Sequence, residues 1–181
     1  MKIYVAGASA EMARAESMIA VLRGNGFEVP FDWTEPVKRH GHANDVSPTV
    51  ADAESTNALR HVENVDAVVC LVPPVGVDTI GLWVELGVAF ALRGIFDYPH
   101  VMIVAPAGAS LRDVAKRSIM FARADTMVAS EADALVELEA MRGARRVETL
   151  GRRYAARVLS SIREIVRGAN RLSEVLSEHA R

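Results

Sequence analysis

An uninterrupted apolar run at residues 66–72, Asp-Ala-Val-Val-Cys-Leu-Val, constrains the fold more than any other feature of the sequence. After Asp66, no polar residue alternates with the apolar ones, and valine recurs along the run. A short, continuous apolar run rich in β-branched residues is typical of a strand that is covered on both faces. Strands of this kind occur mainly in parallel sheets, where crossover helices cover both faces. The run therefore predicts an α/β fold with a parallel sheet.

The rest of the chain alternates between strand-like and helix-like segments. Further strands are expected at 2–6, 27–31, 101–105 and 126–129, and helices at 10–23, 49–64, 82–92 and from Ser130 to about Met141. The polar stretch from Pro36 to Pro48 is expected to be a loop. Parallel strands joined by right-handed crossovers through helices then give a five-stranded parallel sheet, with the strands in the order 2-1-3-4-5.

The charge is unevenly distributed along the chain. Residues 1–141 contain 11 Lys and Arg against 19 Asp and Glu, a balance of −8, whereas residues 142–181 contain 10 Arg against 4 Glu, a balance of +6. Such a split indicates an acidic body and a separate basic segment. We therefore expect an α/β domain at 1–141 followed by a basic C-terminal helix at 142–181.

The basic segment carries a heptad pattern. Its apolar residues are spaced by 4, 3, 4, 3 and 4, at Val158, Ile162, Ile165, Ala169, Leu172 and Leu176. A single helix over 144–179 would be about 54 Å long, which exceeds the width of such a domain. The pattern predicts a homo-oligomer. Nucleic acid is not the expected partner, because no aromatic residues interleave with the arginines, but binding through this segment stays a third hypothesis.

The sequence also predicts where the protein resides. Cys70 is the only cysteine, so no internal disulfide can form, and a reducing compartment is the simpler interpretation. No apolar run approaches the roughly 20 residues that a membrane span needs. The first residues, from Met1 to Ala6, form a strand-like run that is too short for a signal sequence. We expect a cytoplasmic protein with no membrane partner.

The expected strand order places a ligand site between the carboxyl ends of the first and third strands, where the winding direction reverses. The two loops there are Gly7-Ala8-Ser9 and residues 78–87. Glu85 is a carboxylate at the start of an otherwise apolar helix, where a charge is costly unless it is used or paired. Gly81, just before that helix, leaves backbone N–H groups open to an anion. Glu85 either takes part in chemistry or only stabilises its helix, and composition favours neither.

Three segments resemble the nucleoside 2-deoxyribosyltransferase-like superfamily, which includes deoxyribosyltransferases and nucleotide N-glycosidases. They are residues 1–7, residues 65–69 and the motif Gly81-x-x-x-Glu85-Leu86-Gly87-x-Ala89. The resemblance covers roughly residues 1–140. It implies a flavodoxin-like three-layer sandwich and makes Glu85 a nucleophile.

The same resemblance implies further site residues. Thr79 and Gly81 would border the sugar or 5′-phosphate, and Gly7, Ala8 and Ser9 would line the pocket. The sequence Asp32-Trp33-Thr34 resembles a feature of some small members, so Asp32 and Trp33 are candidate substrate contacts. Trp33 fits a half-buried core position about as well.

A second acid must protonate the departing base. Many members of the superfamily carry an aspartate on the preceding helix at the position of Ala58, which supplies no such group here. Glu54, one turn earlier on the same helical face, and Asp78 are the candidate replacements. Arg14 either meets a phosphate or is simply solvated. His40 and His42 are interpreted as loop histidines rather than metal ligands, and no metal or cofactor is expected.

We therefore expect cleavage or transfer at the N-glycosidic bond of a (deoxy)nucleoside or nucleoside 5′-monophosphate, with Glu85 as nucleophile and Glu54 or Asp78 as acid. Such a reaction passes through an oxocarbenium-like state that a carboxylate stabilises or captures. The alternative is a non-catalytic protein that binds or senses a nucleotide with the same pocket. Ala58 favours this alternative, and the Gly81 and Glu85 motif favours the enzyme.

Overall fold

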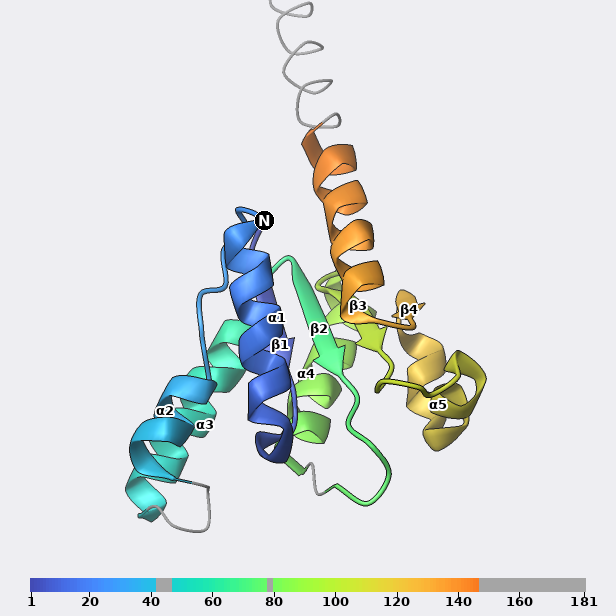
Figure 1. The fold of residues 1–181 in the computed structure, drawn as a ribbon. Helices are drawn as coiled ribbons and strands as arrows, with labels where there is room; N and C mark the ends of the chain where they lie inside the picture. Colours follow the sequence, from blue (N-terminus) through green and yellow to red (C-terminus); the bar gives the residue numbers. More distant parts are fainter. Residues whose placement is uncertain (42–46, 78–79, 147–181) are drawn as a thin grey trace, which may run out of the picture. The chain divides into compact units, whose positions relative to one another are not determined.

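A computed structural model describes residues 1–41, 47–77 and 80–146. Four strands form one parallel sheet in the order β1-β2-β3-β4 (Figure 1). They are β1 (Ile3–Ala6), β2 (Ala67–Leu71), β3 (His100–Val104) and β4 (Thr126–Val128). The helices are α1 (Met12–Gly24), α2 (Thr34–His40), α3 (Pro48–Val62), α4 (Ile80–Phe96), α5 (Leu111–Arg117) and an unlabelled helix over 131–146, with 3₁₀ turns η1 (Ser9–Glu11) and η3 (Ile119–Arg123). The predicted α/β class with a parallel sheet is confirmed.

The two central features of the sheet are its burial and its register. Every residue of β1 and β2 is buried, as the apolar run at 66–72 predicted. The register pairs Ile3 with Ala67 and Ala6 with Cys70, so the carboxyl ends of β1 and β2 lie side by side. The loops that follow these two strands therefore leave the sheet at the same edge.

Helices cover both faces of the sheet. Figure 1 shows α1 on one side of the strands and α4 on the other. Buried apolar side chains repeat at helical spacing on both helices: Ala15, Met18, Ile19 and Leu22 on α1, and Leu82, Leu86, Ala89 and Phe90 on α4. This packing explains why β1 and β2 have no polar face.

The prediction of a strand at 27–31 is wrong, because this segment forms no strand of the sheet. It makes a single parallel bridge between Lys2 and Glu28, in which the Ile3 amide donates to the Glu28 carbonyl at 2.8 Å. The next hydrogen bond of a parallel ladder would need the amide of Pro30, and proline has none. The sheet of the described residues therefore has four strands rather than five. The bridge lies on the free side of β1, where the order 2-1-3-4-5 placed the missing strand.

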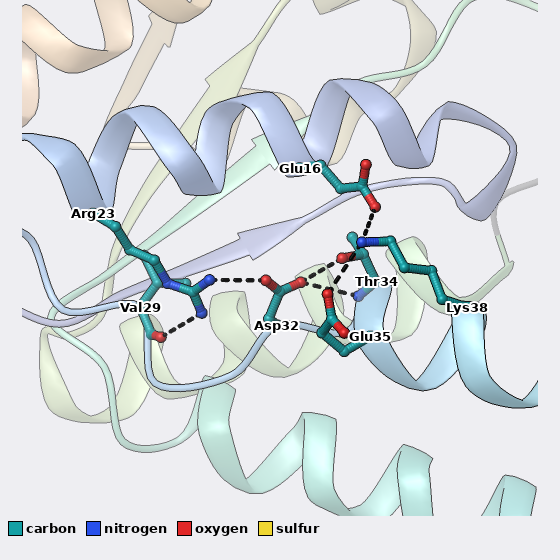
Figure 2. Close-up of polar contacts among 7 residues, drawn as sticks. All are labelled: Glu16, Arg23, Val29, Asp32, Thr34, Glu35 and Lys38. Atoms are coloured by element: carbon teal, nitrogen blue, oxygen red, sulfur yellow. Dashed lines mark hydrogen bonds and ion pairs between the residues drawn. The ribbon is translucent and has the colours of Figure 1, made fainter.

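The stretch after Asp32 is helical where a loop was expected. Helix α2 spans Thr34–His40, and Asp32 Oδ1 accepts hydrogen bonds from the Thr34 amide at 3.2 Å and the Thr34 hydroxyl at 2.6 Å (Figure 2). Pro36 lies in the first turn, where its missing N–H removes no intrahelical bond. Gly41 ends the helix with φ of 84°, which favours glycine. The short helix therefore tolerates a proline in its first turn and ends at a glycine.

The C-terminal helix begins at 131, where Ser130 caps it by accepting a hydrogen bond from the Asp133 amide at 3.2 Å. The chain divides into two compact units, Met1–Glu137 and Leu138–Arg181. Most of the long helix expected over 144–179, including the heptad seam from Val158 to Leu176, lies outside the described residues. No helix in the described ranges is long and apolar enough to cross a membrane.

Trp33 compensates for the missing strand. Its indole Nε1 donates to the Val5 carbonyl at 2.8 Å, at the β1 edge beyond the Lys2–Glu28 bridge. The substitution Trp33→Phe removes this donor from a buried acceptor and shortens a buried side chain. We expect it to lower the free energy of unfolding by about 1–3 kcal/mol in chemical denaturation. The matched control is Trp83→Phe, since Trp83 is 39% exposed, and equal losses for the two variants would contradict this role of Trp33.

Candidate functional site

Glu85 is held against the sheet by a tyrosine. The Tyr4 hydroxyl, from the middle of β1, donates a hydrogen bond to Glu85 Oε1 at 2.7 Å. Tyr4 is fully buried, and Glu85 is partly buried on α4. Helix α4 begins at Ile80, earlier than expected, so Glu85 lies in its second turn rather than its first. The pair joins the α4 layer to the first strand of the sheet.

Burial dominates the electrostatics of this pair. It raises the pKa of Glu85 from 4.5 to about 7, while the hydrogen bond from Tyr4 acts in the opposite direction. Burial, followed by the charge of Glu85, raises the pKa of Tyr4 well above its ordinary value. Burial and the same charge raise the pKa of Cys70 on β2 to about 12. Near neutral pH the carboxyl group of Glu85 is therefore divided between its protonated and ionised forms.

Tyr4 is a site residue that is not among those predicted from the sequence. A signal was present, because Tyr4 is the one residue with a side-chain hydroxyl in a strand otherwise made of Ile3, Val5 and Ala6. A buried tyrosine hydroxyl needs a hydrogen-bond partner. The predicted parallel sheet places the helix that carries Glu85 against that strand, which makes this carboxylate the natural partner.

The turn after β1 is tightly packed at its first residue. A Cβ on Gly7 would lie 3.3 Å from Trp33 Cζ2 and 3.7 Å from the Ala15 Cβ. Ala8 is buried, whereas Ser9 is exposed in η1. The turn stands at the carboxyl end of β1, as expected, and Ser9 is the residue of the three that has a polar side chain open to solvent. Contact of this turn with a ligand stays a prediction.

Asp32 and Trp33 both have partners within the protein. Besides accepting the two hydrogen bonds from Thr34, Asp32 pairs through Oδ2 with Arg23 Nη1 at 3.0 Å, as Figure 2 shows. Trp33 is buried and bonded to β1. These contacts give each residue a structural role, and the substrate contacts expected of them stay predictions.

Arg14 links α1 to the carboxyl ends of two strands. Its guanidinium donates to the Val72 carbonyl at 2.7 Å and to the Ala105 carbonyl at 2.7 Å, just beyond β2 and β3. Its Nε pairs with Glu131 at 2.5 Å. Arg14 is therefore not simply solvated, because its guanidinium bonds to groups of the protein. Its binding of a phosphate stays a prediction.

Of the two candidate acids, Glu54 lies within the described residues. Glu54 is partly buried on α3, and Ala58, one turn later, is buried, so this face of α3 points toward the protein. Asp78 and Thr79 lie outside the described residues. Gly81 is exposed in the first turn of α4, and a Cβ there would meet no atom of the described residues within 4 Å. Space beside the Gly81 backbone is what the expected approach of a ligand requires.

The histidines give no metal centre in the described ranges. His40 is the exposed last residue of α2 rather than a loop residue, and His42 lies outside the described residues. No group of three His, Cys, Asp or Glu side chains that could hold a metal ion occurs in the described part of the chain.

The raised pKa of Glu85 makes stability depend on pH. The folded protein binds the Glu85 proton more tightly than the unfolded chain, so this contribution is complete below pH 4.5 and is lost as pH rises through about 7. We expect the wild type to lose roughly 2–3 kcal/mol relative to Glu85→Gln between pH 5 and pH 8, measured by urea denaturation. The control Glu63→Gln changes an exposed glutamate. A pH-independent difference between Glu85→Gln and the wild type would contradict the burial of an ionisable group at this position.

The comparisons with known proteins concern the fold. No protein-family model matches the sequence, and no match is found among curated proteins. Among solved structures, the 2-deoxyribosyltransferase of the psychrotolerant bacterium Bacillus psychrosaccharolyticus superposes with a TM-score of 0.54 at 20% identity, over 74% of this chain and 90% of that one.

Two further structures match less closely. The CMP N-glycosidase of Clostridium botulinum has a TM-score of 0.48 at 18% identity, over 78% of this chain and 99% of that one. A CheY-like response regulator receiver domain protein of Methanospirillum hungatei has a TM-score of 0.46 at 13% identity, over 81% and 97%. This chain shares the fold of a 2-deoxyribosyltransferase, which is the fold that the resemblance of its sequence implied.

Proposed function

We propose that this protein is an enzyme that cleaves or transfers the N-glycosidic bond of a nucleoside or nucleoside 5′-monophosphate, with Glu85 as its nucleophile. The observation that carries the proposal is the Tyr4–Glu85 pair, in which a partly buried carboxyl group accepts a hydrogen bond from Tyr4 and burial raises its pKa to about 7. The fold shared with a 2-deoxyribosyltransferase supports it. So does the parallel sheet, since ligands of open α/β sheets bind at the carboxyl ends of the strands.

The proposed chemistry uses the ionised form of Glu85. Its carboxylate attacks the anomeric carbon of the sugar as the bond to the base nitrogen breaks, and the base leaves with the bonding electron pair. The base takes a proton from a nearby acid, for which Glu54 and Asp78 are the candidates. Water or a second base then attacks the glycosyl-enzyme ester and frees Glu85. The hydrogen bond from Tyr4 favours the ionised form that this sequence of steps requires.

The substrate would lie along the edge where β1 and β2 end. Gly7, Ala8 and Ser9 follow β1 at that edge. Gly81 lies in the first turn of α4, the helix that follows β2. Thr79 completes the set of proposed contacts to the sugar or phosphate. These assignments come from the sequence motif, and the exposed Gly81 is compatible with them.

Binding without turnover is the second candidate function. It is favoured by Ala58, a buried methyl group at the position where many members of the superfamily have an acid. A protein that lacks the acid can still bind a nucleotide, since binding needs no proton transfer to the base. The assays below separate the two functions.

We expect Glu85→Gln to abolish base release, because the amide keeps the size of the side chain but cannot act as the nucleophile. The loss should be at least about 10³-fold in kcat/KM, measured by chromatography of free base from a panel of nucleosides and 5′-monophosphates. The control Glu63→Gln should retain wild-type rates. Normal turnover by Glu85→Gln would reduce Glu85 to a residue that only stabilises its helix.

The variant Glu54→Gln tests the acid in the same assay. A loss confined to substrates whose base must be protonated, with activated leaving groups spared, would identify Glu54 as the acid. Equal loss on both kinds of substrate would give Glu54 a positioning role instead. If the wild type binds a substrate in calorimetry but releases no base, the second candidate function holds.

We also propose that a second copy of the chain covers part of α4. Its first turns expose apolar side chains, with Ile80 73% and Val84 51% exposed. Trp83, on the same face, contacts Phe121 at a ring-centroid distance of 5.7 Å, and Ile119, nearby in η3, is 90% exposed. Contiguous exposed apolar side chains commonly mark protein interfaces. An apolar face can pack against its own symmetry mate, as a two-fold interface requires.

We expect the wild type to be a homo-oligomer in light scattering and Val84→Glu to dissociate it, because the substitution buries an unpaired charge at the interface. Val136→Glu is the control at another exposed valine. Leu172→Glu tests the seam expected in the C-terminal segment. Dissociation by Leu172→Glu alone would assign the oligomer to that segment, and a monomeric wild type would contradict both interfaces.

A further inference from the structure

Three rings from different parts of the chain form a column that ends at Glu85. Tyr4 stacks on Phe31 with a centroid distance of 6.3 Å and an interplanar angle of 10°. Phe31 stacks in turn on His61 at 4.9 Å and 15°. Tyr4 belongs to β1, Phe31 to the segment before α2, and His61 to the last turn of α3. The column thus crosses from the sheet to α3, with Phe31 in the middle.

Each ring in the column is held by its neighbour. His61 Nδ1 lies 2.8 Å from the Asn57 carbonyl oxygen, within α3. A carbonyl oxygen can only accept, so Nδ1 carries the proton of this bond and the plane of the imidazole is set. Phe31 is only partly buried, so surrounding core residues do not enclose its ring. Stacking between His61 and Tyr4 is what restrains it.

We propose that Phe31 and His61 are positioning residues, which hold the Tyr4 ring at the angle that keeps its hydroxyl on Glu85. The hydroxyl lies in the plane of its ring, so a tilt of the ring moves the oxygen away from Glu85 Oε1. A stacked partner on one face of Tyr4 opposes that tilt. Phe31 and His61 thereby support the 2.7 Å contact between Tyr4 and Glu85 through the ring of Tyr4. The relevance of the column to catalysis rests on the proposed function, but its effect on Glu85 does not.

The environment of Glu85 makes the column measurable. The hydrogen bond from Tyr4 of β1 lowers the pKa of Glu85, and the charge of Glu85 raises the pKa of Cys70 on β2. His61 of α3 is the remaining titratable group of the column. The thiol of Cys70 has a pKa of about 12 and stays neutral at physiological pH. Weakening the hydrogen bond from Tyr4 should therefore raise the pKa of Glu85, because that bond is what lowers it.

The direct experiment follows the side-chain carboxyl carbon of Glu85 by ¹³C NMR during a pH titration of the full-length protein, with Glu85→Gln identifying the signal. We expect Phe31→Leu to raise the pKa of Glu85 by about half a unit to one unit, the size of a weakened hydrogen bond. The control Phe27→Leu makes the same change at a buried phenylalanine four residues earlier in the same segment and should leave the titration unchanged. His61→Ala should shift it in the same direction as Phe31→Leu, and His61→Phe should restore the wild-type value by restoring the stack.

A double variant tests whether the column acts through Tyr4. Tyr4→Phe removes the hydroxyl and should give the largest upward shift. If Phe31 acts only by positioning Tyr4, the double variant Tyr4→Phe/Phe31→Leu titrates like Tyr4→Phe alone. Additive shifts, or an unchanged titration in a folded Phe31→Leu protein, would overturn the inference.

Kinetics then separate this inference from the proposed function. In an active enzyme, the acidic limb of the kcat/KM profile should move upward with the NMR titration in Phe31→Leu and stay in place in Phe27→Leu. A shifted titration in a protein whose wild type releases no base would leave the positioning role standing and overturn the proposed function. Base release with a profile that does not move would overturn the positioning role alone.

Discussion

The pairing of β1 with β2 is the contact on which the rest of the molecule depends. Both strands are buried along their full length, so water cannot satisfy their backbone groups and the ladder between Ile3–Ala6 and Ala67–Leu71 must do so. Because the strands are parallel, the chain between them has to return across the sheet, and it does so through helices that cover the faces. The loops that follow β1 and β2 are thereby brought to one edge. The position of the candidate site is a consequence of that pairing.

The two ends of this arrangement are completed by side chains rather than by further strands. On the outer edge of β1, where Pro30 stops the ladder, the indole of Trp33 supplies the donor for the Val5 carbonyl. At the carboxyl edge, Arg14 supplies donors for the Val72 and Ala105 carbonyls. In both places a single long side chain satisfies backbone oxygens that would otherwise lose their hydrogen bonds on burial. Both residues are candidate substrate contacts from the sequence, and in the structure both donate hydrogen bonds to backbone carbonyls of the sheet, while Arg14 also pairs with Glu131.

The differences between sequence and structure follow from the range of the interactions involved. The buried strands and the helix with Glu85 were predictable, because a continuous apolar run and helical spacing are local patterns. The apolar residues of 27–31 favour a strand, and the structure has only the single bridge at Glu28. Pro30 is the sequence signal for this, because it has no amide N–H to continue the ladder. Helix α2 is not predicted because Pro36 and Gly41 are typical of loops, whereas Pro36 lies in the first turn of the helix and Asp32 accepts two hydrogen bonds from Thr34, its first residue. The Tyr4–Glu85 contact joins residues 81 positions apart, and only the packing of α4 on β1 brings them together.

A carboxyl group at the α4–sheet interface is a departure from what stability alone would select. The buried aliphatic side chains of α4, such as Leu82 and Leu86, stabilise the fold because they are removed from water. Burial of Glu85 in the same layer instead disfavours its ionised form. One hydroxyl from Tyr4 offsets part of that cost and leaves the pKa near 7. A more complete set of donors would have returned the carboxyl to its ordinary range, and an apolar residue would have removed the cost altogether. A group held between those limits can exchange a proton, or act as an anion with little hydration, at the pH of a cell. This balance is the physical basis of the proposal that Glu85 is a functional residue.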